Sequence, residues 1–187
     1  SFYRHQRLRQ VTTLGLALGD PGLELRTGVR GRFARHDFDH ADGLASGDRS
    51  LENVYDTARV PGYDFGATLA EMEGVAIFDA RDAKGATANG FYAEAFGGGA
   101  LPFGELRYGH FGAELTGYID LFRGDRVLVV RAALDAVDGD AGEIPFFALP
   151  DLGGAHRLRG YPLGRFRDEK ALFGTLEYHY PIHELLA

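Results

Sequence analysis

Apolar and polar residues alternate with a period of two along several stretches of this chain, as expected for β-strands that have two different faces. In residues 171–182 one face is apolar, and the other carries Glu177 and His179. In residues 23–34 three arginines share the polar face. This alternation predicts strands in seven segments, which are residues 10–18, 23–34, 65–81, 91–97, 111–121, 126–137 and 171–182.

The connections between the predicted strands alternate between tight turns, such as residues 19–22, and long polar loops. Amphipathic strands of about ten residues with such connections are typical of an outer-membrane β-barrel. The polar faces carry charges of both signs, as a packed polar lumen requires, and Tyr178 and Tyr180 lie near a strand end, where an aromatic girdle would lie. A soluble sandwich or lipocalin-like barrel also alternates, with its apolar side inward.

The number of predicted strands has a consequence for the extent of the barrel. Bacterial single-chain barrels have an even number of strands, and a sheet in lipid has no open edge. We therefore expect either that the sequence is a fragment of a barrel domain, or that residues 1–9 or 49–61 supply further strands.

Composition narrows the class of protein. The 187 residues include 27 glycines, 14 phenylalanines and 9 tyrosines, which favours an all-β fold. The net charge of -7 argues against a nucleic-acid partner, and the lack of cysteine excludes disulfides and thiolate metal sites. No apolar run is long enough for a transmembrane helix, and residues 1–10 lack the apolar core of a signal peptide.

Three segments with possible chemistry give no catalytic, cofactor or metal site. Residues 35–43 gather histidines and aspartates, but they follow a strand and are interpreted as a solvated loop. Residues 135–143 are acidic but lack the spacing of a calcium-binding EF-hand loop. Residues 96–104 are rich in glycine, yet no Lys-Ser or Lys-Thr pair follows to hold a phosphate. We therefore expect a protein that is not an enzyme and needs no cofactor.

Two motifs resemble those of the BamA/TamA-type outer-membrane assembly-factor superfamily, also called the bacterial surface antigen barrel. In that family a long loop carries an Arg-Gly-Phe or Arg-Gly-Tyr tip that folds into the lumen, and the next strand has a Glu-aromatic pattern. The matching tip residues here are Gly153, Gly154, Arg159, Gly160 and Tyr161, and Glu177 with Tyr178 match the strand. Upstream, the strand-end motif matches at Phe78, Asp79, Arg81, Asp82 and Gly90, with Ala80 in place of the usual threonine.

The resemblance covers residues 62–182 and implies a sixteen-stranded antiparallel transmembrane β-barrel preceded by periplasmic POTRA domains. No POTRA-like pattern is visible at the start of this chain, and no four strands follow Glu177, so the whole sequence is interpreted as an incomplete barrel domain. We predict that Glu177 points into the lumen and pairs with Arg159, which would lie inside the barrel and lock the loop there. Removal of one partner of such a buried pair costs about 3–5 kcal/mol.

The resemblance implies an outer-membrane location and a barrel that helps other polypeptides enter or cross the membrane. Its partners would be the lipid bilayer, client outer-membrane or secreted polypeptides, and accessory subunits of a larger complex. Two alternatives stay open at this point. The barrel could be an anchor or export pore for a fused domain such as a patatin-like lipase, or a soluble β-barrel could bind a small apolar ligand.

Overall fold

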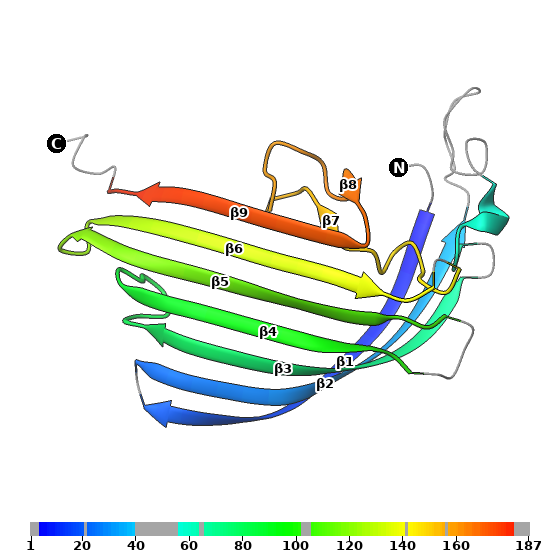
Figure 1. Cartoon of the computed structure of the whole chain (residues 1–187), viewed down its shortest axis with the longest axis horizontal. Coiled ribbons are helices and arrows are strands. Elements are labelled where there is room, and N and C mark those ends of the chain that lie inside the picture. The colour runs from blue at the N-terminus through cyan, green and yellow to red at the C-terminus, as the bar shows by residue number, and fades with distance from the viewer. Residues whose placement is uncertain are drawn as a thin grey trace.

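The computed structural model describes residues 4–20, 22–39, 56–63, 66–101, 106–140, 142–155 and 157–181. Seven strands form one antiparallel sheet in the order β1-β2-β3-β4-β5-β6-β9 (Figure 1). They are β1 Arg4–Asp20, β2 Leu23–Asp39, β3 Ala67–Arg81, β4 Gly90–Ala100, β5 Gly109–Phe122, β6 Arg126–Asp138 and β9 Lys170–His179. A separate pair consists of β7 Asp151–Leu152 and β8 Phe166–Arg167, and a 3-10 helix, η1, spans Thr57–Arg59.

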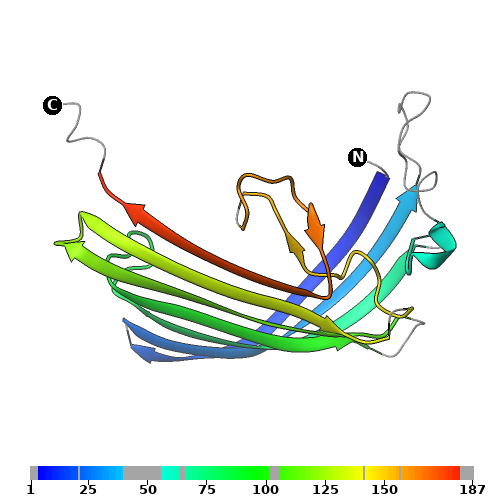
Figure 2. The same ribbon diagram turned by 45° about the horizontal axis from the view of Figure 1, so that its top comes forward.

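The sheet is curved into a trough, and the segment that carries β7 and β8 lies on its concave side (Figure 2). The connections after β1, β3 and β5 lie at one end of the sheet, here called the turn end. The connections after β2, β4 and β6 lie at the other end, here called the loop end. Each strand pairs only with its sequence neighbours in the sheet. The tight turns fix the register of the pairs that they join, and the alternation of apolar and polar residues restricts the register of the others.

The sheet exposes large apolar side chains on one face and buries carboxylates on the other, which is the reverse of the arrangement in a soluble protein. On the convex face, Leu172 and Leu176 of β9 are 74% and 70% exposed, whereas on the concave face Glu73 and Asp79 of β3 are only 4% and 3% exposed. The other large exposed apolar residues of the sheet include Leu8, Leu14, Leu16, Leu18, Leu25, Phe33, Met72, Phe91, Phe111, Leu115, Ile119, Leu121 and Tyr178. Soluble proteins rarely expose a continuous apolar surface of this extent.

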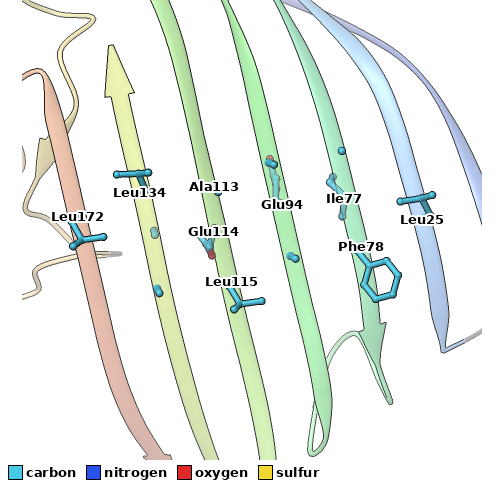
Figure 3. Close-up of a pocket in the computed structure, with 14 residues that line it drawn as sticks. Leu25, Ile77, Phe78, Glu94, Ala113, Glu114, Leu115, Leu134 and Leu172 are labelled. Atoms are coloured by element: carbon cyan, nitrogen blue, oxygen red, sulfur yellow. The ribbon is translucent and has the colours of Figure 1, made fainter. Parts of the chain in front are cut away.

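The convex face also has a shallow apolar groove of about 480 Å³ across the middle of the sheet. Figure 3 shows Leu25, Phe78, Leu115, Leu134 and Leu172 projecting around it. Alanines at positions 76, 93, 95, 113 and 132 also line it. Short side chains beside long ones on neighbouring strands produce this depression, so it is part of the convex apolar surface.

The all-β fold and the seven strands predicted from alternation are confirmed, and most strands are longer than predicted. The alternative that residues 1–9 or 49–61 supply further strands is not supported by the described residues of these segments. Residues 4–9 extend β1, where Arg4 pairs with Asp39 of β2, and residues 57–59 form η1. Residues 4–9 contain one apolar residue, Leu8, so the alternation of side chains does not predict a strand there. They are strand because their backbone pairs continuously with β2. In the part of the chain that the structure describes, no helix has the length and apolar character needed to cross a membrane.

Candidate functional site

The candidate site is the concave face together with the connection between β6 and β9, residues 139–169, here called the long loop. The first part of the long loop is buried: Ile144 is 5% exposed and packs in one apolar cluster with Leu69, Tyr108 and Val137. Pro145 beside it is fully buried. These contacts fix the base of the long loop against β3 and β6 at the loop end.

Aromatic rings of the long loop also pack against β2, on the other side of the trough. Phe147 stacks on His36 with ring centroids 4.0 Å apart, and Phe146 lies 4.9 Å from Phe38. Tyr63, from the connection between β2 and β3, stacks on Phe38 at 5.7 Å. Such pairs stabilise beyond the apolar area that they bury. The sequence interpretation missed this anchor, although the apolar run of residues 144–149 inside a polar loop is a visible signal for it.

The tip of the long loop depends on two glycines. Gly153 and Gly154 have φ angles of 138° and 77°, and a Cβ on Gly153 would lie 2.1 Å from the carbonyl oxygen of Pro162. Gly154 donates its backbone N–H to the carbonyl of Tyr161 at 2.8 Å, and the Tyr161 ring meets Phe166 edge-on at 5.1 Å. Gly160 has open space around it. The paired glycines therefore allow the chain to reverse, and this reversal presents the segment that contains Arg157 and Arg159.

Arg157 connects the tip to β6. Its Nη2 donates to Asp135 Oδ2 at 3.2 Å, and the other carboxylate oxygen of Asp135 lies 2.7 Å from His110 Nε2 of β5. Arg157 also donates to the carbonyl of Asp151 at 3.3 Å. One carboxylate thus joins two strands of the sheet to the long loop.

Arg159 makes the corresponding connection to β9. Its Nη2 lies 3.2 Å from Glu177 Oε1, and Glu177 Oε2 lies 3.0 Å from His179 Nε2. The structure therefore brings together the two residues predicted to pair, with Glu177 on the concave face. The Arg159 side chain is nevertheless 74% exposed in this chain, so the enclosed environment expected for it is not formed by the described residues. An ion pair this open contributes about 0–1 kcal/mol, and its role as a lock stays a prediction.

The strand-end motif lies at the turn end of β3. Arg81 binds Asp79 in a bidentate way, with Nε–Oδ1 and Nη2–Oδ2 distances of 2.8 Å each. Asp82 accepts backbone N–H groups from Ala83 at 2.8 Å and from Asn89 at 3.0 Å, and so closes the turn between β3 and β4. Asp79 and Arg81 thus bind each other on the concave face, whereas Asp82 shapes the turn.

Cross-strand ion pairs fill the middle of the concave face. Glu73 Oε1 accepts from Arg30 Nη1 at 2.6 Å and from Arg32 Nη2 at 2.8 Å. On the other side of the trough, Arg131 binds Glu114 through two bonds of 2.8 Å and 2.7 Å. Hydrogen bonds between a guanidinium and a carboxylate, whether bidentate as at Glu114 or shared as at Glu73, are among the stronger hydrogen bonds in proteins. They explain why carboxylates can be buried on this face.

Tyr108 lies between β4 and β5 at the loop end, and its hydroxyl donates to Glu71 Oε1 at 2.6 Å. Burial and the neighbouring Glu71 carboxylate raise the pKa of this hydroxyl above its ordinary value. Tyr108 is therefore a neutral hydrogen-bond donor at physiological pH.

The segments considered for metal binding serve other contacts where they are described. The side chain of His36 is buried against Phe147, and Asp37 instead binds Arg35 Nε at 3.1 Å. His40 and Asp42 lie outside the described residues. Among the described residues, no group of three or more His, Cys, Asp or Glu side chains is arranged to hold a metal ion.

Comparison of the structure with solved structures gives a match to BamA from Haemophilus ducreyi lacking POTRA domains 1-3. The TM-score is 0.59 at 19% sequence identity, and the match covers 87% of this chain and 31% of the other. The fold is that of part of a BamA-type barrel. At this identity the likeness concerns the fold alone, and the chain spans about a third of the solved BamA chain. No protein-family model matches the sequence, and no curated protein does.

Proposed function

We propose that this chain forms part of the barrel of an outer-membrane factor that inserts or translocates other polypeptides and acts without covalent chemistry. The observation that carries the proposal is the reversed burial of a BamA-type sheet, with leucines outward and ion-paired carboxylates inward. A barrel in lipid needs an apolar exterior, and its polar side chains face the lumen.

A bilayer is the surrounding that fits the convex face. In water this continuous leucine surface would favour aggregation, whereas contact with lipid hydrocarbon removes the free-energy cost of exposing it. The protein should therefore be found in the outer-membrane fraction and should require detergent for extraction. Recovery in the soluble fraction without detergent would support a soluble barrel that binds an apolar ligand.

The long loop fits a factor that handles polypeptides within the trough. Its base is held by apolar packing, and its tip reaches β6 and β9 through Arg157 and Arg159. We propose that the loop divides the lumen and that client outer-membrane or secreted polypeptides, and accessory subunits, are the partners. The Arg159–Glu177 pair would keep the tip beside β9.

Depletion of the intact protein tests the proposal. We expect the amounts of other outer-membrane barrels, measured in isolated outer membranes, to fall before growth stops. Unchanged amounts of those barrels, together with loss of one surface-exposed or secreted domain, would contradict the proposal and favour an anchor or export pore.

A further inference from the structure

Four arginines gather on the concave face, between its middle and its loop end, on the two strands that begin the sheet. Arg7 and Arg9 of β1 and Arg30 and Arg32 of β2 lie on the same face, because Arg7 pairs in register with His36 and Val11 pairs with Arg32. The guanidinium of Arg9 lies in the repulsive electrostatic field of the other three and in the attractive field of Glu71. Four like charges in one region of a curved sheet are unfavourable unless opposite charges balance them.

The carboxylates on this part of the face do not balance them. Glu73 accepts from both Arg30 and Arg32, and Glu71 accepts from the neutral Tyr108 hydroxyl. Four guanidinium groups against two carboxylates leave an excess of two positive charges. Within the described part of the chain, Arg7 and Arg9 have no ion pair or side-chain hydrogen bond.

A buried donor points to the same conclusion. Arg32 uses Nη2 for Glu73, but its Nε is buried and has no acceptor among the described residues. A buried donor without a partner is unfavourable, and an additional acceptor in the cavity would offset its cost. This part of the concave face therefore has both an excess of positive charge and unused hydrogen-bond donors.

Three of these arginines border a cavity of about 180 Å³. Arg7, Arg9 and Arg32 lie on one side, and Phe147 and Ala148 of the long loop close it on another. The volume is below the range of about 300–1,000 Å³ usual for drug-sized ligands. The cavity therefore suits a small, strongly charged group better than an extended organic molecule.

We propose that this cavity binds a phosphate dianion, either free or as the phosphomonoester group of a larger molecule. A phosphate group carries close to two negative charges at neutral pH and three strong acceptor oxygens, which matches the charge excess and the free guanidinium donors. Guanidinium groups bind such oxygens in a bidentate way. The proposal does not depend on whether the protein assembles other membrane proteins.

Binding of inorganic phosphate to the intact protein in a neutral detergent tests this inference. Isothermal titration at pH 8 in chloride buffer should show one site. Arg9→Gln should weaken binding about tenfold or more, because it removes hydrogen bonds to a charged ligand. Arg35→Gln is the matched control, since Arg35 lies on the opposite face of β2 and should leave the affinity within about twofold.

Glu71→Gln should raise the affinity for phosphate, whereas Arg9→Gln should lower it. The Glu71→Gln change removes a negative charge from the cavity lining but keeps an acceptor for Tyr108, so phosphate should bind more tightly. A variant that merely damaged the fold would not gain affinity. Heat-modifiable gel mobility verifies that each variant is folded.

No phosphate binding by the unaltered protein, or equal affinities for Arg9→Gln and Arg35→Gln, would overturn the proposal. Equal binding of the dicarboxylate succinate would overturn the preference for phosphate. Competition with phosphatidic acid in the micelle distinguishes the two sources: displacement of inorganic phosphate supports a lipid phosphomonoester, and no displacement supports a soluble phosphate.

Discussion

The two faces of the sheet differ in the way that each is stabilised. The concave face buries Glu73 and Asp79, and each of these carboxylates binds guanidinium groups. The convex face exposes leucines such as Leu115 and Leu172, over which no other layer of the described residues packs. Burial in this chain therefore follows the curvature of the sheet and the pairing of charges. The concave face depends on specific partners, and the convex face depends on the surrounding medium.

The largest effect is expected from breaking the most buried charge cluster of the concave face. Glu73→Gln leaves Arg30 and Arg32 without their shared carboxylate and should lower the free energy of unfolding by about 3 kcal/mol. Urea unfolding in lipid vesicles measures it. Glu24→Gln is the control, since its partner Lys84 is exposed, and it should lower the free energy of unfolding far less than Glu73→Gln does. Equal losses for the two variants would contradict the difference in burial.

A charged side chain introduced on the convex face tests whether this face contacts lipid. Leu115→Arg, in the middle of β5, should destabilise the protein in vesicles by about 2–4 kcal/mol, because the guanidinium would enter hydrocarbon. Leu115→Ala serves as the control for lost apolar area. An Arg variant as stable in vesicles as the Ala variant would contradict a lipid-facing surface.

A smaller effect is expected where the concave face meets the long loop. Asp135→Asn removes the charge that binds both His110 and Arg157, and should cost about 2 kcal/mol. Trypsin should then cleave faster after Arg157, as measured by mass spectrometry. Asp138→Asn, an exposed position at the end of the same strand, should leave cleavage unchanged.

The smallest effect is expected at the exposed end of the same face. Arg159→Ala removes the contact with Glu177 and should lower the free energy of unfolding by about 0–1 kcal/mol, because the side chain is mostly exposed. A measured loss of about 3–5 kcal/mol would instead mean that the pair is enclosed in the intact protein. The comparison with Asp135→Asn thus separates the two anchors of the loop tip.

Much of the sheet could be predicted from the sequence, because the alternation of side chains along a strand is a local property. It assigned Glu177 to the polar face and placed Arg26, Arg30 and Arg32 of β2 together on one side. The ends of strands were less well predicted. The polar first residues of β1 become strand through pairing with β2, and a partner strand is not a local feature of the sequence.

The sequence by itself determined which residues share a face, since that follows from the period of two. Only the tertiary structure decided which of those residues meet. Glu73 lies 43 positions from Arg30 along the chain, and Arg157 lies 22 positions from Asp135, and both contacts depend on strand register and loop path. The tertiary structure also made the charged face concave and packed Phe147 against His36 across the trough. Sheet curvature arises from the combined twist of many strands, and therefore no single segment specifies it.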